Sequence, residues 1–196
     1  MKSIISAVII SMSICGAAHA ATKKPVEKNW SQEPTSFMGI NFKSNVSDSV
    51  PACTQAFAHL EQSICYMSPP MSGLFMFMGT PGLGLQYTNK LFAQVTDGEV
   101  EYFLMETKSS EFNELSRVLI TKYGEPAQRA KSKVKTKAGA EFDNETLIWK
   151  GKLVSITLEK YGSDINTSTT TLTNNALVAK SAVESERKRN AAASKL

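Results

Sequence analysis

Apolar residues recur at helical spacing in residues 109–126 (SSEFNELSRVLITKYGEP), and this pattern predicts one amphipathic helix with a defined start and stop. The apolar stripe consists of Phe112, Leu115, Val118, Leu119 and Tyr123. Ser109 or Ser110 is the expected N-cap, and Glu111 follows where the helix dipole favours negative charge. Gly124 is suited to close the helix, and Pro126 prevents its continuation. The pattern predicts a helix packed on a sheet and indicates no catalytic residue.

Alternating apolar and polar residues predict a β-hairpin over residues 91–108, with its turn at Asp97-Gly98. A two-residue loop fixes the register and places three pairs on one apolar face: Val95 with Val100, Ala93 with Tyr102, and Leu91 with Leu104. The opposite face then carries Thr96 with Glu99, Gln94 with Glu101, and Phe92 with Phe103. Such a pattern is typical of a sheet that is covered on one side.

A second hairpin is predicted over residues 147–160, with its turn at Lys150-Gly151. Pairing Leu147 with Val154 brings five apolar residues onto one face, namely Leu147, Trp149, Val154, Ile156 and Leu158. Trp149 is therefore expected in the core rather than in a site that stacks on a ligand.

Shorter patterns predict the remaining elements. Residues 37–42 are expected to form the first strand, and residues 74–78 a buried strand followed by a glycine-rich turn. A helix capped by Asp48 or Ser49, with Pro51 in its first turn, is expected between them. Its buried side comprises Val50, Cys53, Phe57, Leu60 and Ile64. Polar residues 167–173 predict a final edge strand, and Asn174 or Asn175 is expected to cap a charged helix.

Together these elements predict an α+β fold in a single domain. We expect an antiparallel sheet of about six to eight strands, two helices packed on one of its faces, and a charged helical tail. The expected divisions are a signal peptide (1–20), a flexible lead-in (21–35), the α+β domain (36–174) and the tail (175–196). Trp30 is expected to pack onto the domain, because tryptophan is highly buried on average.

The first 20 residues have the pattern of a secretory signal peptide. Lys2 supplies positive charge, residues 4–14 an apolar core, and Ala18-His19-Ala20 a cleavage site. Cys15 raises the alternative of a lipoprotein anchor, but Ile14 stands where such signals carry a small residue. We therefore expect export to the bacterial periplasm, with secretion as the alternative, and no transmembrane span in the mature chain.

Two cysteines, Cys53 and Cys65, lie outside the signal, and an even pair in an oxidising compartment favours a disulfide over two thiols or a metal pair. Twelve helical residues would separate them by about 18 Å, beyond disulfide reach, so a bonded pair requires the chain to turn back near Gln62. His59 falls off the predicted apolar stripe and is expected on the surface. The sequence predicts no metal site and no cofactor.

The formal net charge of +4 falls to +3 without Lys2, and this mild charge gives little support for nucleic-acid binding. Five basic residues nevertheless alternate with small ones: Arg129, Lys131, Lys133, Lys135 and Lys137. At strand spacing all five point the same way, which is typical of a solvated edge strand that resists aggregation. The alternative is a patch for an anionic partner such as lipopolysaccharide, a cell-wall polymer or an acidic protein surface.

Three short motifs are F-x-G-I at residues 37–40, K-Y-G-E-P at residues 122–126 and W-x-G-x-x-V-x-I at residues 149–156. On these motifs the chain resembles small uncharacterised exported proteins of Gram-negative bacteria. It is more distantly similar to the helix-on-sheet modules of β-lactamase-inhibitor-like and outer-membrane-assembly lipoprotein folds, although it lacks the lipobox of the assembly lipoproteins. That similarity implies that the chain acts by binding to other proteins. It assigns no functional residue, because the matched positions serve the fold.

The sequence favours a non-enzymatic binding or protein-interaction module of the cell envelope, with a protein or an anionic envelope component as its partner. A serine or cysteine hydrolase would need a histidine base, and only His59 is available. Glu99 and Glu101 are the nearest carboxylate pair for cleaving an envelope polymer, but their place beside a turn suits a solvated surface. An envelope factor that associates with anionic membranes is the third alternative. The sequence leaves the oligomeric state open.

Overall fold

One antiparallel sheet organises the chain, which a computed structural model describes over residues 30–54, 63–67, 71–86 and 89–195. Its eight strands lie in the order β3-β4-β5-β6-β10-β9-β8-β7. In chain order they are β3 (Cys65–Tyr66), β4 (Leu74–Met78), β5 (Lys90–Thr96), β6 (Glu99–Lys108), β7 (Gln128–Lys135), β8 (Glu141–Lys150), β9 (Val154–Glu159) and β10 (Thr167–Asn174). The predicted α+β class and the six-to-eight-stranded antiparallel sheet are confirmed.

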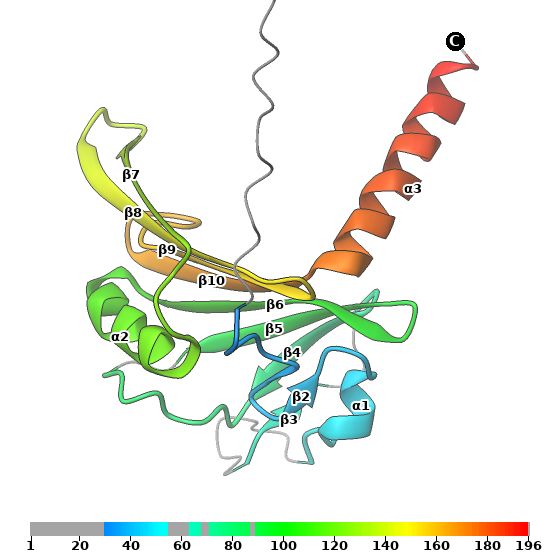
Figure 1. Cartoon of the computed structure of the whole chain (residues 1–196), viewed down its shortest axis with the longest axis horizontal. Helices are drawn as coiled ribbons and strands as arrows, with labels where there is room; N and C mark the ends of the chain where they lie inside the picture. Colours follow the sequence, from blue (N-terminus) through cyan, green and yellow to red (C-terminus); the bar gives the residue numbers. More distant parts are fainter. Residues whose placement is uncertain (1–29, 55–62, 68–70, 87–88, 196) are drawn as a thin grey trace, which may run out of the picture.

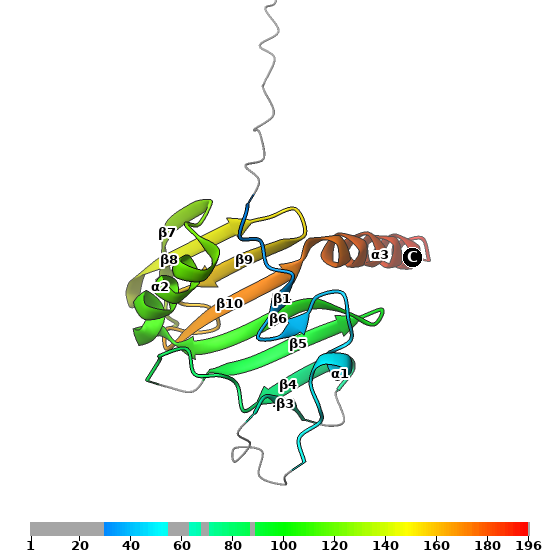
Figure 2. The ribbon, with the colours of Figure 1, turned by 60° about the horizontal axis from the view of Figure 1, so that its bottom comes forward.

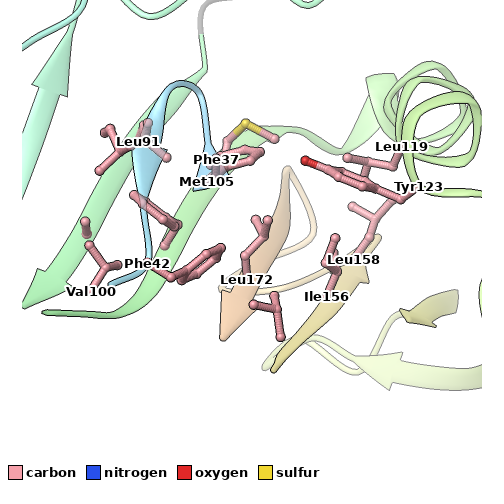
Figure 3. Close-up of a cluster of buried hydrophobic side chains, with 14 of the residues drawn as sticks. Phe37, Phe42, Leu91, Val100, Met105, Leu119, Tyr123, Ile156, Leu158 and Leu172 are labelled. Atoms are coloured by element: carbon pink, nitrogen blue, oxygen red, sulfur yellow. The ribbon is translucent and has the colours of Figure 1, made fainter. Parts of the chain in front are cut away.

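One face of the sheet is covered and carries the core. In Figure 1 the hairpin of β1 (Ser36–Phe37) and β2 (Ile40–Asn41), the short helix α1 (Val46–Ser49) and the helix α2 (Phe112–Tyr123) all lie on this side. Figure 3 shows side chains from β1, β5, β6, β9, β10 and α2 converging between these layers. The helix α3 (Asn175–Ala193) projects away from the sheet in both views (Figures 1 and 2).

The predicted helix is present as α2, but its start differs from the prediction. Ser109–Glu111 form a single 3₁₀ turn, and the N-cap position falls on Glu111, so the expected serine cap is wrong. Ser109 is instead tied to the chain before β10: its backbone N–H donates to Asn166 O, and its hydroxyl donates to Ile165 O, both over 2.8 Å. Its hydroxyl is therefore engaged away from the first turn of α2.

The β5–β6 hairpin turns at Asp97-Gly98 as predicted, but its register changes two residues from the turn. Val95 pairs with Val100, whereas Gln94 pairs with Tyr102, so Glu101 is an extra residue that forms a β-bulge. A shift of one residue moves side chains to the opposite face. Beyond the bulge the pairs are therefore Ala93 with Phe103 and Leu91 with Met105. Ala93 and Leu91 are buried as predicted, whereas Phe103 and Met105 are buried in place of Tyr102 and Leu104.

The β8–β9 hairpin has a longer loop than predicted. Leu147 pairs with Leu158 and not with Val154, and Gly151 donates to Val154 O within the loop. Glu33 Oε1 accepts hydrogen bonds from the backbone N–H groups of residues 153 and 154, which stabilises this wider turn. The predicted apolar face is nevertheless confirmed, because the register differs by four residues and an even shift preserves the face.

The strand β10 lies inside the sheet, so the predicted edge position of residues 167–173 is wrong. It pairs with β6 on one side and with β9 on the other. Ser168, Thr170, Leu172 and Asn174 alternate as its buried side chains. Polar composition suggested an exposed edge, but β-branched threonine fits a pleated interior strand, and the Ser168 hydroxyl donates to Lys160 O over 2.8 Å.

The N-terminal elements are shorter than predicted. Residues 37–42 are not one strand: Met38 and Gly39, with φ of 47° and 84°, form a tight turn between β1 and β2. The predicted helix start at Asp48 or Ser49 is also wrong, because α1 begins at Val46 after an Asn45 capping box and ends at Ser49. Val50 is extended, as the residue before a proline favours.

Several predictions fall on residues outside the described ranges. The signal peptide, most of the lead-in, Phe57, His59, Leu60 and the turn near Gln62 all belong to this group. The last residues of the expected lead-in are described: the indole of Trp30 packs against Tyr123 with ring centroids 6.2 Å apart, which confirms that Trp30 packs onto the domain.

The predicted disulfide between Cys53 and Cys65 is present, with the two Cα atoms 5.0 Å apart. It holds residues 51–53 beside β3, where Cys53 N–H donates to Tyr66 O and Tyr66 N–H donates to Pro51 O. The bridge thus fastens one end of the sheet to the segment that follows α1.

Replacing both cysteines with serine should lower the free energy of unfolding by about 2–3 kcal/mol, because the open chain regains the loop entropy that the bridge removes. Urea denaturation of the oxidised chain and of the double variant measures the difference. Treating the double variant with a reducing agent should change nothing further. A variant as stable as the oxidised chain would contradict this assignment.

The charged tail is confirmed as a helix with few contacts to the body. Asn174 accepts the Leu177 N–H at the N-cap, and Leu177 is the buried side chain of α3 among the described residues. Lys180 donates to Asp97 Oδ2 over 2.7 Å at the β5–β6 turn, and this hydrogen bond raises the pKa of Lys180. Beyond Lys180 the helix is almost wholly exposed.

Candidate functional site

The C-terminal end of α2 is capped by side chains from two distant segments. Gln32, Trp30 and Trp149 donate, in that order, to the carbonyl oxygens of residues 122, 123 and 124, over 3.1, 2.7 and 2.7 Å. The last carbonyls of a helix lack partners within the helix, so three external donors satisfy an otherwise unpaired end. This cap joins the segment before β1, α2 and β8 into one unit.

Gly124 supplies the backbone geometry that this cap requires. Its φ of 78° and ψ of −174° lie in a region that is essentially restricted to glycine. A Cβ atom there would also collide with the side-chain oxygen of Gln32. The glycine of the K-Y-G-E-P motif therefore serves the fold in a specific way: it turns its carbonyl toward the indole of Trp149.

A cleft of about 470 Å³ opens where these segments meet. Its lining includes the aromatic residues Trp30, Tyr123 and Trp149 and the polar or charged residues Gln32, Glu125 and Lys150. However, both indole N–H groups are already used by α2, and Trp149 is only 1% exposed. The two indoles therefore hold the segments around the cleft together, and their N–H groups are not available to a ligand.

The Tyr123 hydroxyl is buried and has no hydrogen-bond partner among the described residues. In Figure 3 its ring extends from α2 into the core, toward Phe37 and Met105. Burial raises the pKa of Tyr123 from 10.0 to about 12. Burying a hydroxyl without a described partner costs stability.

Replacing Tyr123 with phenylalanine should leave the protein as stable or stabilise it by up to about 2 kcal/mol, because it removes an unpaired buried hydroxyl. The pH dependence has a defined sign. Folded Tyr123 keeps its proton up to about pH 12, whereas an unfolded tyrosine ionises near pH 10. The native chain should therefore lose stability relative to the variant as pH rises from about 10 to 12.

Urea denaturation of both chains near neutral pH and at about pH 11 checks this expectation. A Tyr102→Phe variant, at a half-exposed position, is the matched control. A Tyr123→Phe variant that is clearly less stable than the native chain near neutral pH would show that the hydroxyl has a partner.

The predicted basic residues lie on β7, which forms one end of the sheet, and on the turn after it (Figure 2). The prediction of an edge strand is thus confirmed. The β8 strand pairs with β7 so that Lys131 stands opposite Glu145, Lys133 opposite Asp143, and Lys135 opposite Glu141. A row of basic side chains therefore runs beside a row of acidic ones.

Ion pairs occupy three of the five basic residues. Lys133 reaches Asp143 over 3.1 Å, and Lys135 reaches Glu141 over 3.7 Å. Arg129 contacts two carboxylates, those of Glu125 and Glu145. Among the ion pairs of the described residues, none includes Lys131 or Lys137. Because these four carboxylates nearly balance the five basic groups, the row is much less positive than the sequence of β7 alone suggests.

The backbone of β7 has a free side, as no described segment pairs with the strand there. Thr136 N–H donates to Ala140 O where the β7–β8 hairpin closes, which makes residues 136 and 140 a hydrogen-bonded pair. Antiparallel pairs alternate, so even-numbered β7 residues bond to β8 and odd-numbered ones direct N–H and C=O outward. The outward residues are the basic ones: Arg129, Lys131, Lys133 and Lys135.

The two carboxylates that the sequence offered for hydrolysis lie at the other end of the molecule. Glu101 is the extra residue of the bulge, and its Oε2 accepts a hydrogen bond from the Thr96 hydroxyl over 2.6 Å. Glu99 lies beside the β5–β6 turn; the pKa of Lys180 there is raised mainly by its hydrogen bond to Asp97, and Glu99 adds the smallest contribution. The Glu101 carboxylate is thus engaged by Thr96, and both carboxylates lie close to the β5–β6 turn.

Within the described residues, no three His, Cys, Asp or Glu side chains are grouped as ligands for a metal ion. No helix in the same residues is both long and apolar enough to cross a membrane. No protein-family model, curated protein or solved structure matches this chain significantly.

Sequence reasoning missed the cap of α2 and the acidic row on β8. Both Trp30 and the K-Y-G-E-P motif stood out, but their meeting depends on how residues 30–35 return to α2. The acidic row had a visible signal: residues 141–145 (EFDNE) alternate with the same period as the lysines, across a glycine-containing turn.

Proposed function

We propose that this chain is a non-enzymatic interaction module exported to the bacterial cell envelope, where it binds another protein through the free edge of β7. The observation that carries the proposal is the length and exposure of that edge. The strand has eight residues and ends the sheet, and six of its side chains are exposed. Unpaired N–H and C=O groups along such an edge form a template for a strand from a partner.

The other edge of the sheet differs from β7. The strand β3 has two residues, and Ala52 forms a parallel bridge with Tyr66 on its outer side. The Cys53–Cys65 disulfide holds this covering segment in place. Only the β7 end therefore combines length with an open side in the described part of the chain.

The charge distribution favours a protein partner over an anionic polymer or an anionic membrane. A polymer or lipid surface attracts a patch by its summed positive charge, and such attraction falls with salt. Here four carboxylates, those of Glu125, Glu141, Asp143 and Glu145, lie among the five basic groups. A partner that recognises the alternating pattern fits this surface better than one that recognises bulk charge.

Affinity capture with the mature chain, beginning at Ala21, tests the proposal in periplasmic extract. The expected result is one stoichiometric protein partner that is lost with a Lys131→Gln/Lys133→Gln variant. A Lys43→Gln/Lys152→Gln variant makes the same charge change at exposed positions elsewhere and should retain the partner. Deleting residues 176–196 should also retain it.

Two results would overturn the proposal. If the chain hydrolyses peptidoglycan and a Glu101→Gln variant does not, the chain is an enzyme. Recovery of the chain in the cytoplasm with residues 1–20 still attached would remove the envelope assignment; mass measurement of the purified cellular protein distinguishes these forms.

A further inference from the structure

We infer that the β7 edge accepts an extended segment with Asp or Glu at alternate positions, which adds to the sheet as a further antiparallel strand. This inference rests on the proposed function and names the chemistry of the partner. It follows from three features of β7: its outward backbone groups, the row of basic side chains, and the acidic row on β8.

The backbone determines which partner residues face the basic row. The Thr136–Ala140 hydrogen bond fixes which β7 residues bond to β8. The residues that alternate with them direct N–H and C=O outward, and these are Arg129, Lys131, Lys133 and Lys135. An added antiparallel strand forms its hydrogen-bonded pairs with these residues. Directly opposed side chains in such pairs lie on the same face of the sheet and contact one another. Every second partner residue therefore stands beside a Lys or Arg.

The β8 strand shows within the same molecule which side chains suit these positions. It presents Glu141, Asp143 and Glu145 opposite three of the lysines, and two of these pairs form ion pairs. The lysines remain open on the side away from β8: the side chain of Lys133 is 67% exposed even though it contacts Asp143. Lys131 has no ion pair with a described residue, and Glu145, which stands opposite it, contacts Arg129. A second acidic row would complete the pattern.

The same charges reject two other occupants. A second copy pairing β7 with β7 would set lysine opposite lysine or arginine, and like charges directly opposed are destabilising. Residues 21–29 of this chain carry three lysines and a single glutamate, so their charge does not match either. The basic row thus blocks self-association, as expected of an edge strand that resists aggregation, and it still admits an acidic strand.

Synthetic peptides test the inference on the folded mature chain. The main probe has eight residues, the length of β7, with Glu alternating with Thr. Fluorescence anisotropy measures its affinity, and amide chemical shifts of the labelled chain locate it. We expect shifts concentrated on Arg129–Lys135 and at least about a tenfold loss of affinity in Lys131→Gln/Lys133→Gln, with Lys43→Gln/Lys152→Gln unchanged.

Backbone N-methylation separates strand addition from simple charge attraction. The N–H groups of the Glu residues point toward β7 in the inferred pairing, and those of the Thr residues point away. Methylating the Glu nitrogens should abolish binding, whereas methylating the Thr nitrogens should leave it nearly unchanged. A peptide with the same composition but all Glu residues in one block should bind at least about tenfold more weakly, because the pattern is lost.

Three outcomes would overturn the inference. Equal binding of the alternating and block peptides, or indifference to methylation, would leave only electrostatic attraction. If none of the peptides binds, the basic row serves only to prevent aggregation. Shifts on α3 or at the Trp30 cleft would place the site elsewhere. A native partner that is lost with Lys131→Gln/Lys133→Gln but binds without an acidic extended segment would keep the proposed function and reject this inference. Peptide binding without any native partner would do the reverse.

Discussion

Replacing Phe103 with alanine should lower the free energy of unfolding by about 3–5 kcal/mol, whereas Leu104→Ala should cost only about 1 kcal/mol. The bulge at Glu101 causes this difference, because it turns Phe103 into the core and Leu104 to the other face. Phe103 is fully buried, and its ring lies 5.5 Å from that of Phe37 and 5.2 Å from that of Phe42. Its loss opens a cavity beneath the β1–β2 hairpin.

Chemical denaturation of the two variants tests the register directly. Circular dichroism should show that both are folded before denaturant is added. A Leu104→Ala cost larger than that of Phe103→Ala would contradict the bulge and restore the simple two-residue register. Because the two residues are adjacent in the chain, the comparison holds the local sequence nearly constant.

Replacing Trp149 with alanine should also cost about 3–5 kcal/mol, since it removes a large buried side chain. Trp149→Phe separates packing from hydrogen bonding. It keeps most of the apolar contact but leaves the carbonyl of Gly124 without the indole N–H that lies 2.7 Å away. That unpaired carbonyl should cost about 1–3 kcal/mol.

Denaturation curves of the native chain and both variants measure these costs. In the variants, the fluorescence of Trp30 reports whether the C-terminal end of α2 stays packed. The expected order of stability is native, then Trp149→Phe, then Trp149→Ala. Phenylalanine as stable as tryptophan would show that the cap of α2 contributes nothing beyond apolar contact.

The two hairpins explain why sequence patterns predicted one set of faces and failed on another. Both turns were found, and neither register was right over its whole length. The error at Lys150-Gly151 was an even number of residues, so Trp149 and Ile156 kept their predicted core positions. The error at the β5–β6 bulge was one residue, so Phe103 and Leu104 exchanged faces. No local sequence pattern predicts that Glu101 is an extra residue in β6.

Other features depend on contacts between segments that are distant in the chain. The α2 stripe was predicted because it repeats within a dozen residues, whereas its cap needed Trp30 to return across the fold. The position of β10 between β6 and β9 is a property of topology, which its polar sequence obscured. The charge of the edge likewise looked strongly positive until the β7–β8 register placed Asp143 beside Lys133.

Photocrosslinking in living cells tests the central claim most directly. A photoreactive amino acid at Lys131 should join the chain to one protein, at an extended segment with alternating Asp or Glu residues. The same group at Lys43, exposed between β2 and α1, which lie away from β7 in Figure 1, should give no such product. Adducts that form equally from both positions, or no protein adduct from Lys131, would contradict the account.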